Sequence, residues 1–182
     1  MPPSIQTPAP AALPDATSAP PSEAQMAQLL RAARAARRMA YAPYSQFAVG
    51  AALLDEQGRV HAGCNVENAA YPQGQCAEAS AIGQLVLAGG RRILAAVVVG
   101  VTERCAELDA QADADAHSAD AGLPVTPCGG CRQRLREFAA DDTPVWSADL
   151  QSVRARFTLG FLLPASFGPA HLATRPVPNP QP

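Results

Sequence analysis

The sequence predicts an α/β domain in which helices pack against a sheet, because segments with strand signals and helix signals alternate along the chain. The strand-like segments are short apolar runs, rich in β-branched residues and bounded by turn residues. The helix-like segments begin at recognisable start signals, and one of them ends at a pair of glycines. Their order is strand, helix, strand, helix, strand, which is typical of layered α/β folds.

The first predicted elements are a helix and a pair of strands. Ser22 and Gln25 resemble a capping box, so a helix is expected to begin there and to end near residue 39. An apolar, strand-like segment follows over residues 48–54. The residues Asp-Glu-Gln-Gly then form a turn into a second strand over 60–65.

The second half of the predicted fold contains two helices and three strands. Residues 76–87 read as a helix that the following glycine pair ends, and residues 93–101 form a continuously apolar run, as a central buried strand would. The remaining elements are a helix over 128–139, strands over Pro144–Ala148 and Val153–Thr158, and a loop that ends at Phe167-Gly168-Pro169.

Composition divides the chain into a folded body and segments outside it. Residues 1–21 and 175–182 are rich in proline and small residues and cannot bury enough surface to offset their ordering entropy, so both are expected to be disordered tails. The domain is therefore expected over 22–174. Within it, residues 106–122 carry five acidic residues and no basic ones, which indicates an acidic surface insertion.

Charge and hydropathy exclude several classes of protein. The 182 residues have a formal net charge of −2 and a pI of about 5.9, so the basic surface needed for nucleic acid is not expected. There is no apolar run long enough for a membrane span and no secretory signal pattern. Five cysteines with a C-x-x-C spacing favour metal binding in a reducing compartment over a disulfide framework, so we expect a cytoplasmic protein.

Three cysteines have the spacing of a metal site. Cys128 and Cys131 are three residues apart, so both sulfurs can face one ion where a helix begins, and Cys76 is the candidate third ligand. Three protein ligands leave a fourth position for water, as in catalytic zinc sites. Glu78 lies two residues after Cys76 and can carry a proton for that water.

The cysteines also occupy favourable positions for thiolates. Both cysteine motifs coincide with predicted helix starts, where unpaired backbone N–H groups and the helix dipole stabilise negative charge. We therefore expect backbone N–H groups to point at the ligand sulfurs.

Five ordered motifs resemble those of a known family, the small cytidine deaminases of the homotetrameric, three-cysteine kind, and they span nearly the whole predicted body. The motifs are Tyr41-Ala42-Pro43-Tyr44-Ser45-x-Phe47-x-Val49-Gly50, Asn65-Val66-Glu67-Asn68-Ala69-x-Tyr71, Cys76-Ala77-Glu78, Pro127-Cys128-Gly129-Gly130-Cys131-Arg132-Gln133 and Leu162-Leu163-Pro164-x-Ser166-Phe167-Gly168. The resemblance implies a three-layer α/β/α fold with a mixed central sheet of about five strands. It also implies a homotetramer with shared active sites.

The resemblance implies the chemistry of the site. Cys76, Cys128 and Cys131 would bind one Zn²⁺ per chain. Glu78 would take a proton from water, pass it to N3 of the pyrimidine and later to the departing amino group. The expected reaction is hydrolytic deamination of cytidine and 2′-deoxycytidine with release of ammonia, as in pyrimidine salvage.

The resemblance implies substrate contacts from Phe47, Asn65, Glu67, Tyr71, Ala77 and Phe167. Asn65 and Glu67 match the pair that holds the ribose 3′-hydroxyl, and Phe47 matches an aromatic residue beside the base. Phe167 matches an aromatic residue contributed across a subunit interface.

One position departs from the family pattern. The family usually has arginine directly after the catalytic glutamate, where it offsets the charge of the sulfurs, but this chain has Ala79 there. The zinc site would then depend more on backbone donors or on another cation, for which Arg132 is a candidate by sequence.

Other functions remain compatible with the motifs. A deaminase of a nucleoside-like antibiotic such as blasticidin S shares the three-cysteine arrangement, although the Asn65 and Glu67 pair favours a ribose substrate. A polynucleotide deaminase is disfavoured because a carboxylate at the 3′-hydroxyl would repel a 3′-phosphate. A non-catalytic nucleoside-binding protein is a further alternative, against which the intact Glu78 argues.

Several residues also have purely structural interpretations. The cysteines could form a structural zinc site, but that normally requires a fourth protein ligand, and no motif supplies one. Glu67 could be an ordinary loop carboxylate, and Phe47 and Phe167 could be core residues. Cys64 and Cys105 match no ligand position, and the four arginines within 31–38 are expected on the polar face of the first helix.

Overall fold

A five-stranded mixed sheet forms the centre of the protein. The computed structural model describes residues 20–100 and 123–172, and its strands lie in the order β2-β1-β3-β4-β5. They are β1 (Val49–Asp55), β2 (Val60–Cys64), β3 (Ile93–Gly100), β4 (Pro144–Ala148) and β5 (Val153–Thr158). β3 and β4 run parallel, whereas the other neighbouring strands are antiparallel. The predicted α/β class and the mixed five-stranded sheet are thus confirmed.

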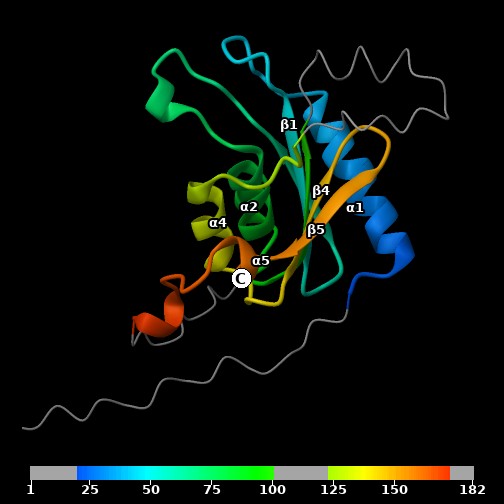
Figure 1. Ribbon diagram of the computed structural model, residues 1–182, viewed down its shortest axis with the longest axis vertical. Helices are drawn as coiled ribbons and strands as arrows, with labels where there is room; N and C mark the ends of the chain where they lie inside the picture. The colour runs from blue at the N-terminus through cyan, green and yellow to red at the C-terminus, as the bar shows by residue number, and fades with distance from the viewer. Residues whose placement is uncertain (1–19, 101–122, 173–182) are drawn as a thin grey trace, which may run out of the picture.

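Helices cover both faces of this sheet and make three layers. Figure 1 shows α1 on one side of the sheet and α2 and α4 on the other. The helices are α1 (Glu23–Arg37), α2 (Ala77–Leu87), α4 (Gly129–Arg136) and the single turn α5 (Leu159–Leu162), with 3₁₀ turns at Tyr71–Gln73 and Pro169–His171. The Ser22–Gln25 capping box that the sequence predicted begins α1.

Alternation along the strands divides the core residues between the two faces of the sheet. In β3, Val97 and Val99 face α1, whereas Ala96 faces α2 and α4. β3 is buried on both faces because it lies at the centre of the sheet with helices on both sides, which explains its continuously apolar sequence. Leu53 and Leu54 of β1 likewise enter opposite clusters.

Two glycines let helices lie directly on the strands. A Cβ atom at Gly63 of β2 would stand 2.4 Å from the backbone nitrogen of Ala81 and 2.6 Å from the carbonyl oxygen of Ala77. A Cβ atom at Gly50 of β1 would stand 2.1 Å from the carbonyl oxygen of Ala33 in α1. Both contacts are with backbone, so no larger residue fits without moving the helix. Gly63 therefore fixes the first turn of α2, which follows Cys76, against the sheet.

A buried carboxylate organises the turn between β1 and β2. Asp55 is fully buried and accepts hydrogen bonds from the backbone N–H of Gln57 at 2.9 Å and from the backbone N–H of Arg59 at 2.8 Å. The Arg59 Nε atom donates to Oδ2 at 2.7 Å, and the His61 Nε2 atom lies 2.8 Å from the same oxygen. Burial raises the pKa of Asp55, but these bonds outweigh it and lower the pKa to about 2.

The observed elements differ from the prediction mainly at their ends. The helix expected over 128–139 ends at Arg136, where the backbone N–H groups of Glu137 and Phe138 bond to carbonyls three residues back, at 3.3 and 3.0 Å, and the α-helical pattern stops. The turn α5 and the two 3₁₀ turns were not expected, since each is too short to show a helical period. The predicted insertion at 106–122 and nearly all of the two predicted tails lie outside the described residues.

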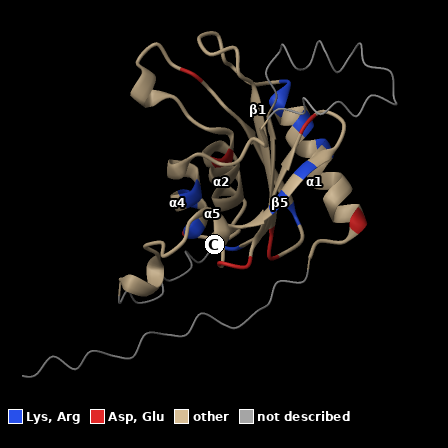
Figure 2. Ribbon diagram, in the orientation of Figure 1, with Lys and Arg blue, Asp and Glu red and all other residues tan. Residues whose placement is uncertain are grey.

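Charge is spread over the surface of the described residues. Figure 2 shows basic residues on α1 and α4, which lie on opposite sides of the sheet, and on β5 at the edge of the sheet. No helix in the described part of the chain combines the length and apolar character that crossing a bilayer requires.

Candidate metal and substrate site

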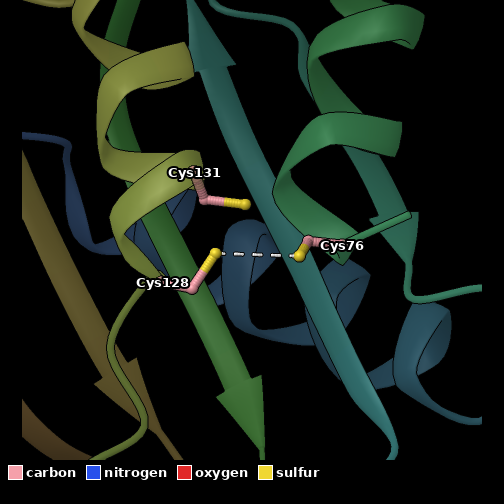
Figure 3. A group of neighbouring side chains, drawn as sticks. All are labelled: Cys76, Cys128 and Cys131. Atoms are coloured by element: carbon pink, nitrogen blue, oxygen red, sulfur yellow. Dashed lines mark hydrogen bonds between the residues drawn. The ribbon is translucent and has the colours of Figure 1, made fainter. Parts of the chain in front are cut away.

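The three predicted ligand cysteines lie together between α2 and α4. Cys76 is the N-cap of α2 and Cys128 is the N-cap of α4, and Cys131 belongs to the first turn of α4. Their three sulfur atoms lie within 4.8 Å of one another, and the sulfurs of Cys76 and Cys128 are 3.8 Å apart. Figure 3 shows the three side chains pointing from the two helix starts into one small space.

The spacing of the sulfurs fits a zinc ion. Tetrahedral coordination with Zn–S bonds of about 2.3 Å places neighbouring sulfurs about 3.8 Å apart. The sulfurs of Cys76 and Cys128 have this separation, and all three donors are of the type that zinc prefers. In the described residues the cluster contains three cysteines and no fourth His, Cys, Asp or Glu ligand, so its composition is that of a site with an open position.

Glu78 is buried beside the sulfurs. Its side chain is 4 % exposed and interacts with the Cys131 thiol. Burial raises the pKa of Cys131, and the negative charge of Glu78 raises it further. Burial also raises the pKa of Cys76. A cation among the sulfurs would reverse this preference for the protonated thiols.

A backbone donor supports one of the sulfurs. Burial alone would raise the pKa of Cys128, but the backbone N–H of Cys131 and the neighbouring thiols outweigh it, so that the pKa is lowered. The lowered pKa has the direction that the predicted N–H group beside a ligand sulfur would produce at the start of α4.

Arg132 contacts the loop before Cys128 and not the sulfurs. Its Nε atom donates to the carbonyl of Pro127 at 2.7 Å, and its Nη atoms donate to the carbonyl of Leu162 at 2.8 Å and to the Thr126 hydroxyl at 2.9 Å. These contacts do not support the candidate role of Arg132 as a cation beside the sulfurs, in place of the arginine that the family usually has at position 79. Its guanidinium group instead holds the loop that carries Cys128.

The segment that contains Asn65 and Glu67 runs beside the residue before Cys76. Val66 pairs with Gln75 through two backbone hydrogen bonds of 2.9 and 2.8 Å, and it also forms a bridge with Tyr41. Glu67 is therefore brought near the start of α2 by the backbone and not by sequence proximity.

The Glu67 carboxylate lies in a pocket of about 370 Å³ lined by Tyr44, Ser45, Glu67, Asn68, Tyr71 and Gly74. Its oxygens accept hydrogen bonds from the Ser45 hydroxyl and from the backbone N–H groups of Tyr44 and Ser45. The hydroxyl contact is the larger cause of a lowered Glu67 pKa. An ionised carboxylate in an open pocket is an acceptor that can hold a hydroxyl group.

Asn65 is tied to the neighbouring backbone. Its Oδ1 atom accepts the N–H of Val49 at 2.8 Å, and its Nδ2 atom donates to the carbonyl of Phe47 at 2.9 Å. The amide nitrogen has a second hydrogen for another acceptor. Phe47 is half-buried, and its backbone position is set by Asn65.

The other predicted contact residues lie in different surroundings. Ala77 is fully buried between Cys76 and Glu78. Tyr71 is 75 % exposed and packs edge-on against Tyr44, with ring centroids 5.8 Å apart. Phe167 is 56 % exposed, stacks on His171 and is joined to α4 through the Gln133 side chain, which donates to its carbonyl at 2.8 Å. The interpretation of Phe167 as a core residue is therefore wrong.

Sequence reasoning did not single out Ser45, which lies within one of the matched motifs. Its hydroxyl joins Glu67 to the backbone of Phe47. A lone serine between two aromatic residues gives no signal of this contact. The contact forms only because the bridge between Tyr41 and Val66 brings Glu67 back to the segment that contains Ser45.

The fold and the site define a class of protein: an α/β domain with a three-cysteine zinc site and a buried glutamate beside it. The sequence model described as "Cytidine and deoxycytidylate deaminase zinc-binding region" matches residues 23–147. The chain therefore belongs to the cytidine deaminase family.

This chain matches individual members of the family over most of their length. The chain is 38 % identical to the cytidine deaminase of Sporosarcina psychrophila over 146 residues, which is 80 % of this chain and 93 % of the relative. The crystal structure of cytidine deaminase from Burkholderia pseudomallei is 40 % identical, with a TM-score of 0.62, and the match covers 78 % of this chain and 98 % of that one. The cytidine deaminase structure from Mycobacterium tuberculosis is 36 % identical, with a TM-score of 0.58, and the match covers 79 % of this chain and 97 % of that one.

Proposed function

We propose that the protein hydrolytically deaminates cytidine and 2′-deoxycytidine to uridine and 2′-deoxyuridine. The observation that carries this proposal is the buried Glu78 carboxylate beside three sulfurs with the spacing of a zinc site. A purely structural zinc site requires neither a buried acid nor an open coordination position. The relatives with the same fold and comparable length are cytidine deaminases, which supports the choice of substrate.

Cys76, Cys128 and Cys131 would hold zinc, which when bound would act as a Lewis acid and make a water molecule more acidic. Glu78 accepts the proton of that water and donates it to N3 of the pyrimidine ring as oxygen adds to C4. The same carboxylate then accepts the proton of the new C4 hydroxyl group and delivers it to the amino nitrogen, the C4–N bond breaks, and ammonia leaves. The oxygen remains as the C4 carbonyl of the uridine product. Burial of Glu78 excludes bulk water from these transfers.

The proposed sugar contacts explain why a free nucleoside fits. The ionised Glu67 carboxylate accepts the ribose 3′-hydroxyl, and the second N–H of Asn65 donates to the same group. A 3′-phosphate would be repelled by Glu67. Phe47 and Ala77 are proposed to contact the base, and Tyr71 is proposed to contact the nucleoside from the rim of the pocket.

We further propose a homotetramer in the cytoplasm. The Phe167 side chain is exposed, and Gln133 of α4 holds its backbone carbonyl, so the ring is placed on the surface, where it can cover the pyrimidine in a neighbouring subunit. Free thiols at Cys76, Cys128 and Cys131 support a reducing compartment, because oxidation would remove the zinc ligands. The domain is proposed to extend over 22–174, with the insertion and both tails as accessory segments.

The test is ammonia release from cytidine by the purified zinc-loaded protein and by the Glu78→Gln variant. The amide keeps the size of the side chain but cannot carry the proton, so turnover should fall by at least about 100-fold with an unchanged zinc content. Glu137→Gln is the matched control, since Glu137 is exposed at the end of α4. Release of ammonia by the Glu78→Gln variant at the wild-type rate would contradict the proposal.

A further inference from the structure

The Ser45 hydroxyl lies between the two residues expected to recognise the sugar and the base. Its Oγ atom donates to Oε1 of Glu67 and accepts the backbone N–H of Phe47 at 3.0 Å. The backbone N–H of Ser45 donates to the other carboxylate oxygen of Glu67 at 3.2 Å, beside the N–H of Tyr44 at 2.8 Å. Three donors therefore fix the plane of the Glu67 carboxylate.

The direction of these hydrogen bonds is determined by chemistry. The N–H of Phe47 can only donate, so it occupies a lone pair of the Ser45 oxygen. The Glu67 carboxylate can only accept when ionised, so the hydroxyl proton of Ser45 points toward Glu67. The lowered pKa of Glu67, for which the Ser45 contact is the largest cause, agrees with this direction.

The backbone around Ser45 is shaped for this contact. Gln46 adopts a left-handed conformation with φ of 57°, which is uncommon for a residue with a side chain. Its N–H donates to the carbonyl of Ala42 at 3.1 Å, and its side-chain amide donates to the carbonyl of Pro43 at 2.8 Å. These bonds compensate for the unfavourable φ and turn the chain so that the Ser45 oxygen meets the N–H of Phe47.

We propose that Ser45 is a positioning residue, which holds the Glu67 carboxylate in one orientation for the ribose 3′-hydroxyl and joins it to the backbone of Phe47. The proposal rests on the proposed function and deepens the same site. Asn65 holds the carbonyl of Phe47 on the other side of the residue. Sugar recognition and base recognition are therefore parts of one hydrogen-bonded unit, and a change at Ser45 affects binding of the nucleoside more than the chemical step.

The test compares Ser45→Ala with the wild type on cytidine and on 3′-deoxycytidine, which lacks the hydroxyl that Glu67 would accept. Loss of a hydrogen bond to a charged group should raise KM for cytidine about 10-fold, with kcat changed less than about 3-fold. The increase in KM for 3′-deoxycytidine should be markedly smaller, because Ser45 acts through Glu67. Ser152→Ala is the matched control, since the Ser152 hydroxyl lies 3.5 Å from an Asp149 carboxylate oxygen in the turn between β4 and β5.

The outcomes separate the two proposals. A wild-type protein that does not deaminate cytidine overturns the proposed function. The wild type could deaminate cytidine while Ser45→Ala raises KM equally for both nucleosides, or for neither. That result overturns the positioning role and leaves the proposed function standing. Should Ser45→Ala not fold, Ser45→Thr and Ser45→Val make the same comparison, because they share a shape and differ in the hydroxyl group. Threonine should restore most of the affinity for cytidine, and equal KM values for these two variants would refute the inference.

Discussion

Replacing Asp55 with asparagine should remove the stabilisation that this one carboxylate gives to the folded protein between pH 2 and pH 4. Asp55 is fully buried and accepts hydrogen bonds from two backbone N–H groups and from Arg59, with His61 at hydrogen-bond distance. These contacts stabilise the ionised form and lower the pKa from the ordinary 3.8 to about 2. The unfolded chain therefore binds a proton at Asp55 at a higher pH than the folded protein does.

The size of the effect follows from the pKa difference. Each pKa unit corresponds to about 1.36 kcal/mol, so the lowering at Asp55 amounts to about 2 kcal/mol of unfolding free energy. This contribution is complete above about pH 4 and is lost as the pH falls through the folded pKa of about 2. At neutral pH, Asp55→Asn should lower the unfolding free energy by about 2 to 4 kcal/mol, because Arg59 and His61 lose a charged partner.

The measurement is urea unfolding of the wild type and of Asp55→Asn between pH 2.5 and pH 7, followed by the fluorescence of the single tryptophan, Trp146. The difference in unfolding free energy between the two proteins at each pH isolates the contribution of Asp55. Release of zinc in acid and titration of the other carboxylates affect both proteins. Asp141→Asn serves as the control, because Asp141 is 70 % exposed and lies 3.4 Å from Arg136, so its loss should change stability by less than about 1 kcal/mol.

The stability difference between the wild type and Asp55→Asn should shrink as the pH falls. A difference that stays constant from pH 7 to pH 2.5 would show that Asp55 does not have a lowered pKa in the folded state. A variant as stable as the wild type at pH 7 would refute the role of the buried carboxylate altogether.

Three further predictions concern the metal and the assembly. Cys128→Ser should abolish stoichiometric zinc in metal analysis, whereas Cys64→Ser, which removes a sulfur outside the cluster, should retain it; equal zinc contents would exclude the assigned ligands. Arg132→Lys should accelerate zinc transfer to a chelator and lower the unfolding free energy by about 2 kcal/mol, because an ammonium group cannot reproduce the three hydrogen bonds of the guanidinium group. An unchanged transfer rate would contradict the role of Arg132 in holding the loop that carries Cys128. Phe167→Ala and Glu78→Gln chains, each impaired alone, should recover activity in mixed tetramers; verified mixed tetramers without activity would refute a shared pocket.

Element positions were predictable where a local signal coincides with the tertiary structure. The Ser22–Gln25 pair begins a helix whose cap is formed within the segment itself, and the strands at 144–148 and 153–158 were located to the residue. The end of α4 was not predictable, because residues 137–140 contain no glycine or proline to mark the change to hydrogen bonds three residues back. The turn α5 was missed, since a single turn capped by Thr158 shows no periodicity.

The metal cluster was predictable to the residue, whereas the surroundings of the site were not. The spacing of Cys128 and Cys131 is a local signal, whereas Cys76 was assigned from the motif that it shares with Glu78, and the structure brings all three sulfurs together. The contacts of Arg132 with Pro127 and Leu162 depend on how α4 packs against a later segment. The contact between Ser45 and Glu67 likewise depends on the bridge at Val66, which joins residues distant in sequence.

The position of the sulfurs between two helices also ties the stability of the protein to metal supply. Cys76 and Cys128 belong to helices whose starts are 52 residues apart in sequence, so bound zinc acts as a reversible cross-link of the native state. A ligand that binds only the folded chain adds about 1.4 kcal/mol of stability for each tenfold rise in its free concentration above the dissociation constant. Metal starvation would therefore lower the amount of folded protein, and its abundance would follow the chemical potential of zinc in the cell.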